Sequence, residues 1–325
     1  MTTTTEPRTA PIAAPSTPEP SRDVRHLSDK EIAFQRRAVL VVTGLPTLGL
    51  VAGVVFAATR GGIAFSDVVA FLVMTIITGL GITIGYHRML THQSFKTSPW
   101  VRGAFMIAGS MALEGPPIEW VADHRRHHAH SDHEGDPHSP HFGRGDGFWP
   151  KLGGVWHAHV GWMFKQERSV ARRWAPDLLA DPLVRRIDRL FLVWAFLTLA
   201  LPAAIGFAVG GTAMSALTGL LWGGLVRLAY IHHVTWSINS ICHFFGKRTY
   251  RTTDHSTNNW LLSIVSFGES WHNNHHAFPT SAVHGLDRGQ VDISGALIRL
   301  MERVGLVRDV RRPTEAARAR KRLES

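Results

Sequence analysis

Four apolar runs of membrane-spanning length constrain the fold of this chain more than any other feature. Each run holds 19 to 21 residues, and about 20 helical residues cross the hydrocarbon core of a bilayer. The runs therefore predict an all-α integral membrane protein with four transmembrane helices. They cover Ala38–Ala58, Val68–Tyr86, Leu190–Gly210 and Ala213–Ile231.

The connections between the runs predict two hairpins and one orientation. A short segment with one basic residue, Arg60, joins the first run to the second. The segment that joins the third run to the fourth has no basic residue. Because basic loops stay on the cytoplasmic side of a membrane, we expect both termini, the loop 87–189 and the region 232–310 to be cytoplasmic. A shorter apolar segment, Val101–Leu113, is too short to span and is predicted to lie at the interface or to form a re-entrant helix.

Composition divides the chain into three parts. Residues 1–30 are rich in Thr, Pro and Ala, which predicts a disordered tail. Residues 31–310 are expected to form the membrane domain with a cytoplasmic helical cap, and residues 311–325 a basic tail. The net charge of +10 suits an anionic membrane surface or a phosphate-bearing substrate. Nucleic acid is not an expected partner, because the charge is interleaved with apolar runs and matches no reader motif.

Histidine is concentrated in segments that all fall on the predicted cytoplasmic side. The densest segment, Asp123–His141, holds seven histidines in nineteen residues. An even number of spans places the segments after the second and fourth runs on the same side as this one. The candidate metal-binding residues are His87, His92, His124, His127, His128, Asn239, His243, His272, His275 and His276.

The spacing of these histidines fits metal binding from helices. Residues three or four apart share one helical face, as His124 does with His127 and His128. His87 and His92 are five apart, about 140° out of phase on an α-helix, so they can share a site only if the helix widens or ends between them. Neutral imidazole suits iron, zinc and copper. Because a structural zinc is closed at four ligands, nine histidines predict two metal ions.

Several neighbouring side chains are candidates for supporting roles. A metal-binding histidine donates its other N–H to a carboxylate or carbonyl, and Cys242, the single cysteine, is expected to be a small buried side chain. Isolated loop histidines are expected to be solvated, whereas His138 is open between the two roles. His232 and His233 are expected at the interface or behind the ligands. The candidate supporting carboxylates are Glu119, Asp123, Asp136, Asp254 and Glu269, and the histidines expected in solvent are His26, His130, His133, His141 and His284.

A metal-transporting membrane protein is the alternative outside the enzymes. Such a protein needs ionisable groups within its spans to form a path for the ion. The first three runs contain none, and the fourth contains only Arg227. The pattern therefore favours a metal site at the membrane surface over a path through the membrane.

Four motifs resemble those of the membrane fatty-acid desaturases, most closely the stearoyl-CoA (Δ9) branch. They are HRMLTH at 87–92, EWVADHRRHH at 119–128, NSICH at 239–243 and GESWHNNHHAFP at 268–279. The resemblance covers roughly residues 36–310. It implies a non-haem di-iron centre, with two iron ions held by the nine histidines above and Asn239 reaching one iron through a water. It also implies an apolar acyl tunnel with Trp120, Thr235 and Trp236 at its bend.

The resemblance implies an O2-dependent oxidoreductase that inserts a cis double bond, at Δ9, into a long-chain saturated acyl group. A hydroxylase on the same scaffold is the alternative within the enzymes. Acyl-CoA is the expected substrate, and Asp123 matches a position that contacts it. Ala122 stands where animal members carry arginine, however, so a membrane lipid carrying the acyl chain stays open. The cations that could pair with CoA phosphates are Arg125, Arg126, Lys165 and Arg168.

Electrons must come from another protein. One cysteine cannot hold an iron–sulfur cluster, and the sequence has neither a haem-binding cytochrome b5 segment nor a dinucleotide fingerprint. We therefore expect a separate reductase or a ferredoxin-type donor, which would dock on the cytoplasmic face.

Overall fold

A computed structural model describes residues 23–141, 143, 145 and 147–324. The predicted N-terminal tail lies outside the described residues up to position 22. Residues 24–26 form strand β1 (Val24–His26), which pairs with β3 (Glu167–Ser169), and helix α1 begins at Asp29. Ser28 caps α1 by accepting a hydrogen bond from the Glu31 backbone N–H, while the Glu31 carboxylate accepts from the Ser28 N–H.

Four helical segments are long and apolar enough to cross a membrane, so the predicted fold class is confirmed. The first is α1 (Asp29–Arg60) and the second is α2 (Phe65–Leu80) with the π-helix η1 (Gly81–Thr91). The third is α9 (Phe191–Gly210). The fourth joins α10 (Ala213–Gly219), the π-helix η3 (Leu220–Val226), α11 (Arg227–Ser240) and the 3₁₀ turn η4 (Ile241–His243).

Small residues let the third and fourth segments approach closely. A Cβ on Gly206 would lie 2.2 Å from the Ser215 carbonyl oxygen, and one on Gly219 would lie 2.6 Å from the Pro202 carbonyl oxygen. Close backbone approach of this kind is how helices pack where apolar burial gives no driving force. The buried Arg227 donates to the Gly223 carbonyl of its own segment at 3.0 Å and to the Thr198 hydroxyl of α9 at 2.7 Å, so its charge faces protein.

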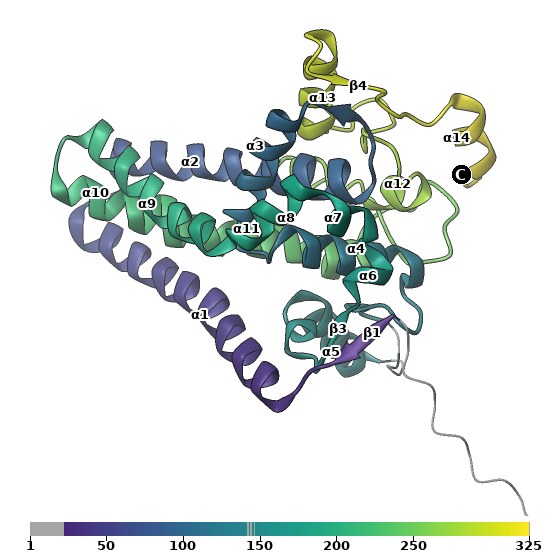
Figure 1. Cartoon of the computed structure of the whole chain (residues 1–325), viewed down its shortest axis with the longest axis horizontal. Coiled ribbons are helices and arrows are strands. Elements are labelled where there is room, and N and C mark those ends of the chain that lie inside the picture. Colours follow the sequence, from purple (N-terminus) through teal and green to yellow (C-terminus); the bar gives the residue numbers. More distant parts are fainter. Residues whose placement is uncertain (1–22, 142, 144, 146, 325) are drawn as a thin grey trace, which may run out of the picture.

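The remaining elements gather at one end of the long helices, on the right in Figure 1. The apolar core beneath them includes Ile84, Met106 and Val121, and this core joins η1, α3 and α4. Strand β2 (Lys96–Thr97) pairs with β4 (Val307–Arg308). The helices are α3 (Pro99–Ser110), α4 (Pro117–His130), α5 (Phe148–His159), η2 (Gly161–Phe164), α6 (Ala171–Trp174), α7 (Pro176–Ala180), α8 (Pro182–Arg189), α12 (His272–Ala277), α13 (Ile293–Arg303) and α14 (Glu315–Lys321).

The C-terminal segment, predicted from sequence as a basic tail, packs on this end of the molecule. The Leu323 N–H donates to the Thr249 carbonyl at 3.0 Å, and the Arg251 N–H donates to the Lys321 carbonyl at 2.7 Å. The Lys321 ammonium donates to the Ala277 carbonyl, the last residue of α12. These bonds place α14 beside the histidine-bearing helix α12.

Candidate metal centre

All nine predicted histidines come together in two adjoining clusters. Within each cluster the potential ligand atoms lie within 4.8 Å of one another. The two clusters adjoin, because the His128 and His276 ring centroids are 4.6 Å apart. The first cluster is His87, His92, His124, His128 and His275, and the second is His127, His243, His272 and His276.

A π-helix solves the spacing problem of His87 and His92. Residues Gly81–Thr91 form η1, and the His92 N–H donates to the His87 carbonyl, five residues earlier, at 3.2 Å. This wider winding is the i→i+5 pattern of a π-helix, which occurs often at functional sites. The two rings consequently lie with centroids 4.9 Å apart. The sequence required the helix to widen or end between them, and it widens.

Ordinary helical spacing supplies the other ligands. In α4, His124, His127 and His128 face the site from the second half of the helix, and in α12 the site is faced by His272, His275 and His276. The fourth long segment continues past the predicted end at residue 231, so η4 brings His243 to the second cluster. Asn239 lies one helical turn earlier and is partly buried, and its contact with a metal through water stays a prediction.

The distances between nitrogens fit a metal ion in each cluster. The Nε2 atoms are 2.9–3.1 Å apart in four histidine pairs, three in the first cluster and one in the second. Two nitrogens that bind one ion at about 2.1 Å and at right angles lie about 3.0 Å apart. In addition, the buried Nε2 atoms of His92, His127 and His276 have no hydrogen-bond partner among the described residues.

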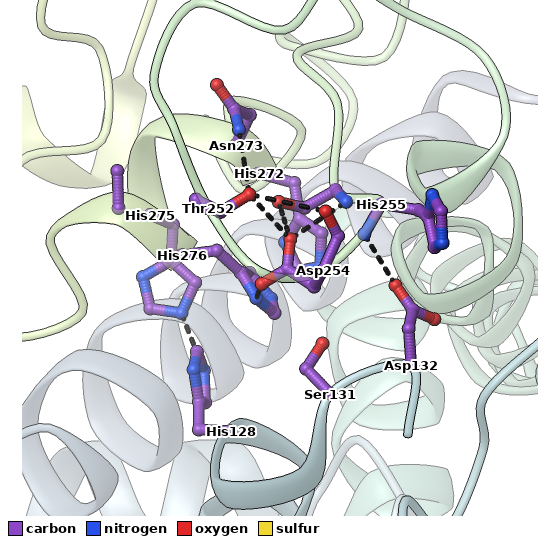
Figure 2. A network of polar contacts seen from close by, with 12 residues as sticks. His128, Ser131, Asp132, Thr252, Asp254, His255, His272, Asn273, His275 and His276 are labelled. Carbon is purple, nitrogen blue, oxygen red and sulfur yellow. Dashed lines mark hydrogen bonds and ion pairs between the residues drawn. The ribbon is translucent and has the colours of Figure 1, made fainter. Parts of the chain in front are cut away.

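Carboxylates orient four of the rings from behind. Nδ1 of His276 lies 2.8 Å from Asp254 (Figure 2), and Nδ1 of His243 lies 2.8 Å from Asp132. A donor N–H at Nδ1 leaves the Nε2 lone pair directed into the cluster. The remaining two pairs are His127 with Asp136, at 3.1 Å, and His87 with Glu269.

Three of the five predicted supporting carboxylates hold histidines, and two do not. Asp136, Asp254 and Glu269 contact ligand rings. Glu119 instead accepts from Arg168 at 3.1 Å, and Asp123 accepts from Ser169, because both lie on the side of α4 that faces β3. Sequence analysis missed Asp132, which sits inside the histidine-rich stretch. Its φ of +61° turns its side chain back toward His243, and no sequence spacing reveals this.

The buried imidazoles are suited to bind metal as neutral ligands. Burial and neighbouring histidines hold the pKa of His124, His128 and His275 well below the ordinary value. Burial lowers the pKa of His127, but Asp136, Asp132 and Asp254 together raise it above the ordinary value, so a metal ion there would displace a proton. An uncharged donor set of this kind matches the imidazole preference of iron, zinc and copper.

Two expectations about isolated histidines were wrong. His284, expected in solvent, is 1% exposed and accepts from Arg88 at 3.2 Å. His141 is half-buried, and its Nε2 donates to the His243 carbonyl at 2.8 Å. His138, for which the sequence left both a solvated and a supporting role open, is buried beside His127 with ring centroids 4.3 Å apart. Tertiary packing of the loops over the clusters buries these rings.

Arg88 fixes the first cluster to the C-terminal region. Its fully buried guanidinium donates to Glu269 at 2.8 Å and to Asp292 at 3.0 Å. Glu269 also binds His87, so one carboxylate joins the cation to a candidate ligand. Sequence analysis did not single out Arg88, although it follows His87 directly in the first motif.

Two of the three residues predicted at the tunnel bend contact a buried carboxyl group. Trp120 stacks on His124 with centroids 4.9 Å apart, and its Nε1 donates to Glu114 at 3.2 Å. Thr235 also hydrogen-bonds to Glu114, and burial raises the pKa of this carboxyl to about 7. Trp236 is buried on the same helix as Thr235 and stacks on His232, 5.0 Å away. Sequence analysis missed Glu114.

An apolar cavity of about 500 Å³ lies between the first, second and fourth long segments. It is lined by apolar and aromatic side chains, among them Leu50, Phe71, Trp222 and Tyr230. Val234, next to Thr235, forms part of its wall. A space of this character accepts an alkyl chain rather than a polar ligand.

The three arginines predicted for CoA phosphates are engaged within the chain. Arg125 donates to both Asp177 oxygens and to three backbone carbonyls. Arg126 pairs with Glu167 at 3.0 Å, and Arg168 pairs with Glu119 at 3.1 Å. The backbone carbonyl of Lys165 accepts from Gln35. Carboxylates therefore neutralise the three arginines.

Comparisons with known proteins agree with this geometry. A family model described as fatty acid desaturase matches residues 64–297. The hex-5-enoyl-[acyl-carrier protein] acetylenase of Moorena producens (strain JHB) is 39% identical over 86% of this chain and 88% of its own length. The sn-1 stearoyl-lipid 9-desaturase of Anabaena variabilis is 38% identical over 81% and 91%. Delta-9 acyl-lipid desaturase 1 of Arabidopsis thaliana is 42% identical over 78% and 77%.

Proposed function

Because the chain belongs to the fatty acid desaturase family, we propose that it inserts a cis double bond at Δ9 into a saturated acyl chain esterified to a membrane lipid. The observation that carries this proposal is the pair of histidine clusters beside Trp120, with an apolar cavity between the long helices. The enzyme is an oxidoreductase, and its proposed cofactor is two iron ions, one in each cluster.

The reaction removes two hydrogens from adjacent methylenes of the acyl chain. One O2 accepts four electrons, two from the acyl chain and two from a donor protein, and with two protons from solvent it leaves as two waters. No acidic or basic side chain removes hydrogen from an unactivated methylene, so the bound iron pair would supply the oxidation chemistry. The protein holds the metals, excludes water and selects the methylene pair.

Each part of the site has a task in this reaction. The carboxylate-bound rings, such as His243 on Asp132 and His276 on Asp254, hold their Nε2 lone pairs toward the metals. Trp120 lies flat against His124, and its bond to Glu114 fixes the indole. A rigid aromatic wall beside the metal ligands sets which carbons of the acyl chain can approach them.

Two observations favour a lipid-bound acyl chain over acyl-CoA. The arginines that would bind CoA phosphates are already paired with carboxylates, so binding phosphate there would break their ion pairs with Asp177, Glu167 and Glu119. Two of the three relatives described above are named as acting on lipid-linked acyl chains. Since such substrates already lie in the bilayer, they can enter between the long helices.

The proposed orientation places the metal centre in the cytoplasm. Basic residues outnumber acidic ones in the segments predicted to be cytoplasmic, in agreement with the positive-inside rule. A separate cytoplasmic electron donor supplies the two electrons.

Expression in a host that lacks its own desaturase tests the function. We expect unsaturated C16 or C18 chains in the membrane lipids, and none with a His275→Ala variant that still inserts in the membrane. Purified enzyme should desaturate stearoyl phosphatidylglycerol in vesicles faster than stearoyl-CoA. Hydroxylated chains without alkenes would refute the desaturase assignment, and a preference for stearoyl-CoA would refute the lipid assignment.

A further inference from the structure

A second cavity, of about 430 Å³, reaches both histidine clusters, and Trp120, Thr235 and Trp236 are not among the residues that line it. His128 of the first cluster and His276 of the second form part of its lining. Figure 2 shows His128, His276, Asp254 and Thr252 in this region. Trp120 lies in the first turn of α4 and His128 in its last, so the acyl bend and this cavity lie at opposite ends of one helix.

Two exposed cations form the rim of this cavity. Arg251 and Lys321 line it, and neither forms an ion pair with a carboxylate in the part of the chain that the structure describes. Arg251 donates to the Arg320 carbonyl at 3.0 Å, and Lys321 donates to the Ala277 carbonyl at 2.6 Å. The Lys321 ammonium also lies 5.3 Å from the centroid of the Phe278 ring. Both cations are thus held in place, and no described carboxylate neutralises them.

The carboxylate inside the cavity does not neutralise this rim. Asp254 is buried, and its oxygens bind His276 at 2.8 Å and Thr252 at 2.9 Å. Behind the rim, Asp287 is already bound by Arg318 and Arg322 of the C-terminal segment. The mouth of the cavity therefore carries net positive charge. The same cavity is lined by His128, a candidate ligand of the first metal, and by His276, a candidate ligand of the second.

We propose that the mouth formed by Arg251 and Lys321 is the docking site for an acidic one-electron carrier protein of the ferredoxin class. This inference rests on the proposed function, which needs two electrons per double bond. Two reduced carriers dock in turn, each loses one electron, and the metal centre gains the two electrons that O2 reduction requires. A positive rim attracts an acidic partner and speeds its association at low salt.

The separation of the two entrances supports this assignment. The proposed acyl-bend residue Trp120 lies at the start of α4, whereas the carrier would approach at the end of α4, beside α12 and α14. Neither therefore blocks the other during turnover. The bonds of residues 321–323 to residues 249–251 and to α12 preform the mouth before any partner arrives.

The test uses full-length purified enzyme, with a plant-type [2Fe–2S] ferredoxin and its NADPH-dependent reductase as the probe. The double charge reversal Arg251→Glu with Lys321→Glu should raise KM for ferredoxin about tenfold at low salt, with kcat nearly unchanged. Salt screens exposed charges, so the difference should shrink at about 0.5 M NaCl. Lys151→Glu, at an exposed lysine on α5, is the matched control and should leave KM unchanged.

A second measurement separates docking from folding and from chemistry. Dithionite-reduced enzyme given O2 should form the same amount of alkene in a single turnover with the double variant as with wild type. The milder pair Arg251→Gln with Lys321→Gln should raise KM by a smaller factor. Equal KM values for the reversal variant and Lys151→Glu would overturn the proposal. The proposal would also be overturned if the wild-type enzyme formed alkene after reduction by dithionite but never with ferredoxin as the electron donor. No alkene under either condition would overturn the proposed function itself.

Discussion

Replacing Glu114 by glutamine should remove a pH dependence from the stability of this protein. The Glu114 carboxyl lies behind Trp120, and its second oxygen, Oε1, is buried without a hydrogen-bond partner among the described residues. Burial raises the pKa of this group from 4.5 to about 7, because a carboxylate loses hydration there that two hydrogen bonds do not replace.

The size of the effect follows from the two pKa values. They differ by about 2.5, and one pH unit corresponds to about 1.4 kcal/mol. Between pH 4.5 and 7 the folded protein keeps this proton while the unfolded chain has lost it, so the free energy of unfolding falls as pH rises. The group therefore contributes up to about 3 kcal/mol of stability below pH 4.5 that is lost once pH exceeds 7.

Thermal unfolding of the detergent-solubilised protein at pH 5 and pH 8 measures this difference. The wild type should lose several degrees of Tm between the two values, and Glu114→Gln should lose less and unfold about 5 °C higher than wild type at pH 8. Glu134→Gln, at an exposed glutamate, is the control and should follow the wild type. Parallel Tm curves for Glu114→Gln and wild type would refute the assignment of a neutral buried carboxyl.

Three further substitutions test separate parts of the account. Gly81→Ala should cost about 2 kcal/mol or more and release metal, because its Cβ would lie 2.2 Å from the Gly109 backbone nitrogen, whereas Gly44→Ala meets nothing within 4 Å and should be tolerated. Equal Tm values for the two would contradict the close packing of η1 on α3. Asp254→Asn should weaken iron binding about 10–100-fold in chelator competition, and unchanged affinity would remove the carboxylate from its orienting role. Trp236→Ala should alter double-bond position or chain-length preference in product analysis without changing iron content, and an unchanged product profile would argue against its place at the bend.

Local sequence was sufficient to predict the spans and the histidine clusters. Hydropathy over about 20 residues depends on the run itself, so all four runs appear in the structure as helices long and apolar enough to cross a membrane. The ends of the spans differ, since α2 and α11 continue as helix beyond their apolar runs to deliver His87 and His243. The five-residue spacing of the first motif already required a change of winding, and the π-helix supplies it.

The supporting residues depend on tertiary contacts and could not be predicted in this way. Asp132 reaches His243 across 111 positions of sequence, and Arg88 reaches Asp292 across 204. His284 looks like an isolated loop histidine until the loop folds against Arg88 and buries it. Glu114 acquires its raised pKa only when the fold buries it, and the hydrogen bonds from Trp120 and Thr235 oppose that rise. Burial and partner choice are properties of the assembled fold, and single-sequence spacing does not encode them.

The most direct test of the metal centre is the number of iron ions per chain, measured by elemental analysis of anaerobically purified protein. Two clusters predict two irons in the wild type. His92→Ala should lose the iron of the first cluster and His272→Ala the iron of the second. Each variant should retain about one iron, because the four or five imidazoles of the other cluster are unchanged. One iron in the wild type, or two in both variants, would contradict the account.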